Sequence, residues 1–262
     1  MMQDVLGTVL SNHCIADGIY KLTVRLPEEF HAECKPGQFA QLAIPNADAH
    51  ILRRPISIHS FGEIGRTVSF VYQVKGAGTD RLTQCSEGNA IQMLLPLGNG
   101  FSLPENADKI LFIGAGIGAA PLKYAAQCFS DKKIIMVLGF KNKEKAYLIQ
   151  KYQECSERLV LCSDDGSIGE KSYVGAVARR VAQEEKPGVI MACGPNIVLQ
   201  QVKEFAEELT IPCQLSMEAR MGCGIGACVV CNVKIGTKES WHYKRCCVDG
   251  PVFDAKEVVF DD

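Results

Sequence analysis

Five cysteines near the C-terminus have a spacing that can bind iron. Cys223, Cys228 and Cys231 form a C-x4-C-x2-C pattern, and the adjacent Cys246 and Cys247 follow after a gap. Three thiolates at this spacing with a distant fourth are typical of a plant-type [2Fe–2S] cluster. Zinc is the alternative, although structural zinc sites usually pair two C-x2-C motifs and only one is present here. The spacing therefore favours a cluster over zinc or metal-free thiols, and leaves the fourth ligand open between two cysteines.

Small residues surround these cysteines in the same segment. Gly222, Gly224, Gly226 and Ala227 lie within the run that contains the three closely spaced thiols. Glycine adopts the positive φ angles that a tight loop needs, and its lack of a side chain lets backbone N–H groups approach sulfur. The segment is thus expected to wrap one side of the cluster.

A glycine-rich loop further upstream could bind phosphate. Gly114, Gly116 and Gly118 follow an apolar segment at 109–113, which we expect to be a strand, and precede an expected helix. Backbone amides at such a helix N-terminus can bind a pyrophosphate. The acid that ends the second strand of a standard Rossmann domain is missing, because residues 138–141 read LGFK. We predict a nicotinamide-nucleotide domain of a related kind, with a plain structural turn as the alternative.

Two other expected strands end in polar residues. Ligands of open α/β sheets bind at the carboxyl ends of the strands, where Cys193 could contact the nicotinamide or could be a small buried thiol. Asp164 and Asp165 could bind the ribose hydroxyls and repel a 2′-phosphate, which favours NAD over NADP. An ordinary acidic turn is the alternative.

Consecutive arginines in the first third of the chain could also bind an anion. Arg53 and Arg54 stand just before Ser57 in a β-rich segment. Guanidinium groups bind pyrophosphate well, and a serine adds a hydroxyl. A solvated edge strand with basic residues is the alternative.

The hydrophobic pattern predicts three parts. Alternating apolar and polar residues at 19–26, 67–74 and 89–95 indicate an antiparallel β-barrel or sandwich, with one short helix near Gly78. After residue 103, strands and helices alternate, which predicts a parallel α/β sheet. The expected domains are a β-barrel over 1–103, an α/β nucleotide domain over 104–216, and a small cluster-binding module over 217–262.

Composition indicates a globular cytoplasmic protein. The chain has 262 residues, of which 47% are hydrophobic and 22% charged, and its net charge of −2 indicates neither a nucleic acid nor an anionic membrane as partner. We expect no signal peptide and no membrane span, because no basic segment precedes an apolar one at the N-terminus and no apolar run is long enough. Thirteen cysteines in a chain of this length are expected to be free thiols in a reducing compartment, apart from one metal site.

These motifs together resemble the ferredoxin reductase family of FAD- and NAD-binding proteins. Within it, the chain most resembles the electron-transfer subunits of class 1B dihydroorotate dehydrogenases, over essentially its whole length. The most specific motifs are RRPISI (53–58), PLGNGF (96–101), GAGIGAAP (114–121), MEARMGCGIGACVVC (217–231) and CVDGPVF (247–253).

The resemblance implies a set of cofactor contacts. It places Arg54 at the FAD pyrophosphate, Ser57 near the flavin, and Cys247, the cysteine before VDGP, as the fourth cluster ligand. The wider family has an aromatic residue where this chain has Ile56, which leaves Tyr72 as the candidate for stacking on the flavin. The gap between the third and fourth cluster ligands is also shorter than in plant-type ferredoxins. The implied FAD contacts are Arg54, Pro55, Ile56, Ser57, Val71, Tyr72, Gln73, Gly78 and Thr79.

The resemblance also implies a function in pyrimidine biosynthesis. A partner subunit that contains FMN would oxidise dihydroorotate, and this chain would pass the electrons through its [2Fe–2S] cluster and FAD to NAD, in a heterotetramer with two copies of each subunit. No residue here is a candidate general base for dihydroorotate, so we expect no orotate from this chain alone. The alternatives are a subunit of a sulfide dehydrogenase or a ferredoxin–NADP oxidoreductase, or a redox sensor based on the cluster.

Overall fold

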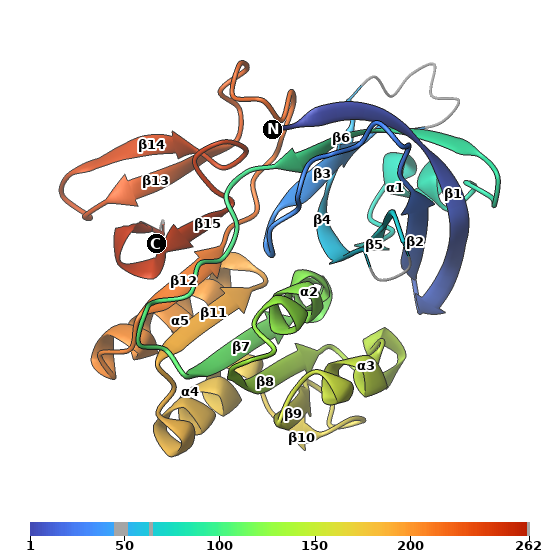
Figure 1. Ribbon diagram of the computed structural model, residues 1–262. Coiled ribbons are helices and arrows are strands. Elements are labelled where there is room, and N and C mark those ends of the chain that lie inside the picture. Colours follow the sequence, from blue (N-terminus) through green and yellow to red (C-terminus); the bar gives the residue numbers. More distant parts are fainter. Residues whose placement is uncertain (45–51, 63–64, 261–262) are drawn as a thin grey trace.

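A computed structural model describes residues 1–44, 52–62 and 65–260. It contains a closed β-barrel, a sheet covered by helices, and a C-terminal β-hairpin beside both (Figure 1). Among these residues no helix is long and apolar enough to cross a membrane.

The barrel is antiparallel, and its order is β1-β2-β5-β4-β3-β6. Alternate residues such as Leu22, Val24 and Phe70 point inward and are fully buried, as the period of a strand requires. Leu82 of the short helix α1 belongs to the same core. The elements are β1 (Gln3–Ala16), β2 (Ile19–Arg25), β3 (Phe39–Leu42), β4 (Arg54–Phe61), β5 (Thr67–Gln73), α1 (Ala77–Leu82) and β6 (Ala90–Leu97).

The second layer is a seven-stranded sheet of order β10-β9-β8-β7-β11-β12-β15. Its strands pair in parallel except β15, which is antiparallel to β12. The elements are β7 (Lys109–Ala115), η1 (Gly116–Ala119), α2 (Ala120–Cys128), β8 (Lys133–Phe140), η2 (Lys143–Lys145), α3 (Ile149–Glu154), β9 (Arg158–Ser163), β10 (Glu170–Lys171), α4 (Val174–Glu185), β11 (Val189–Cys193), α5 (Asn196–Glu208) and β12 (Cys213–Ser216).

Both faces of this sheet are buried, as expected for parallel strands with crossover helices. Leu111 and Ile113 of β7 share a core with α4 and α5, whereas Ile110 and Phe112 share one with α2. The successive residues of one strand therefore hold helices on opposite faces.

The C-terminal segment forms a hairpin and then returns to the sheet. Its elements are β13 (Asn232–Gly236), β14 (Trp241–Arg245), β15 (Val252–Asp254) and η3 (Ala255–Glu257). Phe253 of β15 lies opposite Leu215 of β12, so this segment supplies the edge strand of the sheet. Cys231, Cys246 and Cys247 belong to the same buried core as α4 and α5.

Helix α2 packs against strand β4 of the barrel and joins the two layers (Figure 1). His59 Nδ1 lies 2.7 Å from the carbonyl oxygen of Ala120. The Tyr124 hydroxyl donates a hydrogen bond of 2.7 Å to the carbonyl of Cys34. These buried contacts fix the barrel relative to the sheet and set the width of the space between them.

The predicted fold class is confirmed. The barrel and the parallel sheet appear where the periodicity indicated, and the expected helix after the glycine loop begins at Ala120, after a 3-10 turn. Strand β1 and the hairpin β13–β14 were not predicted from the sequence. The domain limits at 103 and 216 stay a prediction, since the segment beyond 216 returns to the sheet.

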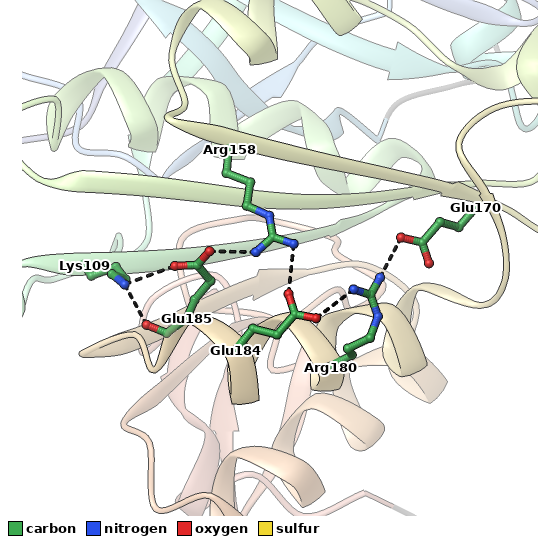
Figure 2. A network of polar contacts seen from close by, with 6 residues as sticks. All are labelled: Lys109, Arg158, Glu170, Arg180, Glu184 and Glu185. Carbon is green, nitrogen blue, oxygen red and sulfur yellow. Dashed lines mark hydrogen bonds and ion pairs between the residues drawn. The ribbon is translucent and has the colours of Figure 1, made fainter.

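A network of charged side chains ties the sheet to α4 (Figure 2). Arg158 donates to Glu184 (2.9 Å) and to Glu185 (2.7 Å). Lys109 forms an ion pair with Glu185, and Arg180 forms one with Glu184 at 2.9 Å. Hydrogen bonds from Arg158, the largest cause, lower the pKa of both Glu184 and Glu185.

We expect Arg158→Gln to lower the melting temperature at pH 7 by about 1–3 °C, because exposed ion pairs contribute little individually. A carboxylate whose pKa is lowered by folding stabilises the protein above its unfolded-state pKa, and this contribution disappears as pH falls through the folded-state value. The deficit of the variant should therefore shrink below about pH 4.5. Thermal unfolding followed by circular dichroism between pH 3 and 7 would measure it.

The matched control is Arg179→Gln. Arg179 forms a single exposed pair with Glu208, so its substitution should have a smaller effect. An equal deficit for Arg158→Gln at pH 3 and pH 7 would contradict the role of the network.

Candidate functional site

A cavity of about 240 Å³ lies between the barrel and the sheet. Strands β4 and β5 form one wall, the loop before α2 and the end of β11 form another, and residues after β12 close the third side. The structure thus brings together eight of the nine predicted FAD contacts, namely Arg54, Pro55, Ile56, Ser57, Val71, Tyr72, Gln73 and Thr79.

The ninth predicted contact, Gly78, lies directly under Arg54. A Cβ atom at Gly78 would collide with the guanidinium group, so a larger residue there would require the Arg54 side chain to move. Thr79 Oγ1 accepts hydrogen bonds from the backbone N–H groups of Lys75 (2.9 Å) and Gly76 (3.2 Å) and so fixes the start of α1. Arg54 and α1 therefore form one end of the cavity as a unit.

The two arginines of the RRPISI motif have different environments. Arg53 makes a bidentate ion pair with Asp4 of β1, with N–O distances of 2.8 and 2.9 Å. It does not line the cavity. Arg54 lines the cavity and donates to the carbonyl of Leu52. Of the pair, Arg54 is the one placed to meet a bound anion.

Tyr72, the candidate for stacking on the flavin, is already stacked within the barrel. Its ring lies 5.8 Å from that of Tyr20 at an angle of 23°, and its hydroxyl donates to Asn12 Oδ1 at 3.1 Å. Burial raises its pKa well above the ordinary value, so the hydroxyl stays protonated. Its atoms contribute to the cavity wall, and its stacking on a flavin stays a prediction.

A second cavity of about 520 Å³ adjoins the first. The two share Gln73, Lys75, Ile117 and Glu218, so they form neighbouring parts of one cleft. The second is lined by the carboxyl ends of the parallel strands, where open α/β sheets bind nucleotides.

The glycine loop is shaped by close backbone contacts. A side chain at Gly118 would collide with the carbonyl group of Cys193, and Gly116 has a φ of +55°. A Cβ atom at Gly114 would lie only 2.8 Å from the Cα atom of Ala119. The loop therefore needs glycine to bring the start of α2 against β11, and both Gly116 and Gly118 line the cleft.

Cys193 ends β11 and lines the first cavity, but its thiol is almost fully buried. Desolvation, with a smaller contribution from Glu218, raises its pKa to about 12. At neutral pH the group is a neutral thiol. Its contact with a nicotinamide ring stays a prediction.

The two aspartates after β9 are placed differently. Asp164 lines the second cavity together with Lys141. Asp165 instead accepts hydrogen bonds from Ser167, at 2.9 Å from the backbone nitrogen and 2.6 Å from the hydroxyl, which lower its pKa. The structure therefore brings only the first aspartate to the cleft, along with a lysine whose role the sequence did not indicate.

A larger cavity of about 1090 Å³ lies elsewhere, around α2 and α3. It contains none of the predicted site residues and is lined mostly by lysines and carboxylates. Its position away from the carboxyl ends of the strands makes it a poorer nucleotide site than the cleft.

The four predicted cluster ligands form two pairs. Cys223 and Cys228 contact each other through N–H to sulfur distances of 3.4 Å in both directions. The backbone nitrogen of Cys247 lies 3.4 Å from the sulfur of Cys231. These four thiolates would hold a [2Fe–2S] cluster, which takes four cysteine ligands.

The two adjacent cysteines point in different directions. The Cys246 thiol donates to the carbonyl of Met217 at 3.3 Å and is completely buried. Cys247 lies beside Cys231. Desolvation, followed by this neighbouring thiol, raises the pKa of Cys247 to about 12, and a bound metal would displace that proton.

The loop around the first pair has the conformation expected from its glycines. Gly224 and Gly226 have φ angles of +74° and +82°, which side chains disfavour. Backbone N–H groups, first that of Cys228, lower the pKa of Cys223 to about 6. Arg245 donates to the carbonyl of Gly226 at 3.2 Å and so ties this loop to the turn that contains the fourth cysteine.

A single-ion site is not found in the described ranges 1–44, 52–62 and 65–260, because no three His, Cys, Asp or Glu side chains gather around one point there.

Gln41, which lies beside the cysteine loop, was not indicated by the sequence as a site residue. Gln41 of β3 is completely buried, and neither its Nε2 nor its Oε1 atom has a hydrogen-bond partner in the described structure. An unpaired buried amide costs about 1–3 kcal/mol. Gln41 lies on β3 and contacts Gly224 of the cysteine loop, which is far away in the sequence. A local motif cannot indicate such a contact.

Exposed apolar residues occur in the cysteine loop, in β14 and in the turn that follows it. We call these residues the cluster-side patch. The Trp241 and Tyr243 rings lie 5.1 Å apart, and Lys234 stands over the indole at 4.5 Å. The patch consists of Ile225, Val229, Val230, Trp241, Tyr243 and Val248.

Comparison with known proteins gives consistent matches. Residues 218–259 match the family model of the iron–sulfur cluster binding domain of dihydroorotate dehydrogenase B. The electron transfer subunit of dihydroorotate dehydrogenase B (NAD(+)) from Caldanaerobacter subterraneus subsp. tengcongensis is 37% identical over 252 residues, 96% of this chain and 97% of the relative. That from Bacillus velezensis is 37% identical over 256 residues, 96% of this chain and 97% of the relative.

Solved structures of two reductases have a similar fold. An NADH-dependent reduced ferredoxin–NADP oxidoreductase structure has a TM-score of 0.84 at 27% identity, over 97% of this chain and 89% of that one. Phthalate dioxygenase reductase, at 16% identity and a TM-score of 0.67 over 89% of this chain and 87% of that one, shares the fold.

We expect Cys247→Ser to lose most of the cluster and Cys246→Ser to retain it, because the Cys247 thiol interacts with the Cys231 thiol whereas the Cys246 thiol donates to the carbonyl of Met217. Iron content and the electron paramagnetic resonance (EPR) signal of the reduced protein would measure the difference. The two variants are matched controls for each other, and equal loss in both would refute the assignment of the fourth ligand.

We expect NADH to be preferred over NADPH in dye reduction, because Asp164 would repel a 2′-phosphate. Asp164→Asn leaves Lys141 in the same wall and should raise the kcat/KM for NADPH relative to NADH about tenfold, equivalent to about 1.4 kcal/mol. Asp165→Asn, in the neighbouring turn, is the control and should leave the ratio unchanged. Similar kcat/KM values for the two nucleotides in the unmodified protein would contradict the prediction.

Proposed function

Because this chain belongs to the family of electron-transfer subunits of dihydroorotate dehydrogenase B, we propose that it carries electrons from a catalytic partner to NAD in pyrimidine biosynthesis. The observation that carries the proposal is the convergence of three elements on one cleft: the barrel wall, the carboxyl ends of the parallel strands, and the segment that leads into the cysteine loop. A chain that moves electrons between bound groups needs such short separations.

We assign FAD to the first cavity. Arg54 would bind its pyrophosphate, since it is the arginine that faces the cavity. Ser57, Tyr72 and Gln73 would line the flavin ring. The neutral thiol of Cys193 and the adjoining backbone would exclude water at the junction with the second cavity.

We assign the nicotinamide nucleotide to the second cavity. The loop at Gly116 and Gly118 would bind its phosphates, and Asp164 its ribose. Because Gln73 and Lys75 line both cavities, the nicotinamide and flavin rings would meet where the cavities join. Holding both rings in one orientation is the contribution that the protein makes to hydride transfer.

We assign a [2Fe–2S] cluster to Cys223, Cys228, Cys231 and Cys247. When bound, the cofactors supply the redox chemistry, one electron at a time at the cluster and two at FAD and NAD. The cysteine loop would direct its backbone N–H groups toward the thiolates, as those of Cys223, Ile225 and Cys228 already approach sulfur.

We further propose that the cluster-side patch contacts the catalytic partner, an FMN-containing subunit, in a heterotetramer with two copies of each. Exposed aromatic and aliphatic side chains are enriched at subunit interfaces. All thirteen cysteines are free thiols in the structure, which supports a reducing, cytoplasmic location.

A second candidate is a subunit of an NADH-dependent reduced ferredoxin–NADP oxidoreductase, which the structural likeness at 27% identity favours. The higher identity of the dihydroorotate dehydrogenase B relatives, over nearly full length, supports the first proposal. Assaying orotate formation with the partner subunit distinguishes the two.

We expect the chain alone to pass electrons from NADH to a dye and to leave dihydroorotate unchanged. In the complex, Cys228→Ala should abolish NAD-linked orotate formation and spare NADH–dye activity, because the dye can take electrons at FAD. Absorbance at 340 nm and orotate assays would measure both activities.

The matched control is Cys128→Ala, which removes an exposed thiol on α2 and should leave both activities intact. Normal coupling of dihydroorotate to NAD in a cluster-free Cys228→Ala complex would rule out the proposed route.

A further inference from the structure

Gln41 occupies a position between the barrel and the cysteine loop. On β3, Ala40 and Leu42 face the barrel core, whereas Phe39 faces the core shared with the C-terminal segment. By the alternation of a strand, Gln41 shares the side of Phe39. It is nevertheless completely buried, so the segments packed on the outside of the barrel must cover it.

The cover is the cysteine loop at Gly224. A Cβ atom at this glycine would lie 2.7 Å from Gln41 Cγ and 2.9 Å from its Nε2. Gly224 also has a positive φ and directly follows Cys223. The amide group is therefore in contact with the loop that would hold the cluster.

The amide has no hydrogen-bond partner among the described residues, although both of its polar atoms are buried. Its backbone neighbours are Pro55 on β4 and Leu94 on β6, which offer no polar side chain. An apolar residue would pack at this position without an unmet polar group. A glutamine here is explained if its partner is a group that binds to the protein.

We propose that Gln41 donates a hydrogen bond from its side-chain amide to the sulfur of the iron–sulfur centre and thereby raises the reduction potential of that centre. This inference rests on the proposed function. Gln41 is absent from the lining of the FAD cavity but contacts the cysteine loop, which favours sulfur over the flavin as acceptor. Hydrogen bonds to the sulfurs are among the factors that set cluster potentials, because they stabilise the more negative, reduced state.

The test is a redox titration of the loaded protein followed by EPR, comparing the wild type with Gln41→Leu and Gln41→Met. Both substitutions keep the volume and remove the donor. We expect one-electron reduction of the cluster to become at least threefold less favourable, about 30 mV lower at 59 mV per tenfold. The FAD potential, followed by absorbance, should stay unchanged. Gln92→Leu is the control, because this exposed glutamine on β6 bonds to Asp4.

A second measurement needs no variant to fold. In wild-type protein with 15N in its glutamine side chains, pulsed EPR of the reduced cluster should detect a coupled 15N nucleus. Absence of this coupling, an unchanged cluster potential in a fully loaded variant, or a shift confined to the flavin would each overturn the inference. A wild-type protein that shows no cluster signal would instead contradict the proposed function.

Discussion

The packing of α2 against β4 is the interaction on which the rest of the site depends. The contacts of His59 with Ala120 and of Tyr124 with Cys34 hold the barrel and the sheet at one fixed separation. The cleft exists only because of that separation, since one wall comes from each side. The helix that makes this contact also begins at the glycine loop, so phosphate binding and domain packing use the same element.

Close backbone approach is the second constraint. Gly78 under Arg54, Gly118 against Cys193, and Gly224 against Gln41 each lie where a side chain would collide with a functional group. The three contacts join α1 to β4, the glycine loop to β11, and the cysteine loop to the barrel. At Gly118 the neighbour is backbone, so glycine is required there by a residue distant in sequence, whereas Gly224 is also favoured by its positive φ.

Much of the fold could be predicted from the sequence because its signals are local. Strand alternation and the C-x4-C-x2-C spacing depend on residues a few positions apart. Strand β1 escaped prediction because irregularities after Val9 and Cys14 interrupt its alternation. The placement of Asp165 in a turn, the partnerless amide of Gln41 and the orientation of Cys246 depend on tertiary contacts. The choice of Cys247 as a ligand came from resemblance to a family. The structure adds a physical reason, because the thiol of the adjacent Cys246 is bound to the carbonyl of Met217.

Strand β15 has a consequence for biosynthesis. It closes one edge of the parallel sheet with residues 252–254, more than 140 positions after the strand β7 begins that sheet. On the ribosome, all strands of the barrel are available once residue 97 has emerged. The edge of β12, in contrast, stays unpaired until β15 has been synthesised, near the end of the chain. The fourth cysteine emerges only a few residues before β15. Cluster insertion and closure of the sheet therefore belong to the same late stage, and a nascent chain stalled before it would present an open strand edge to chaperones.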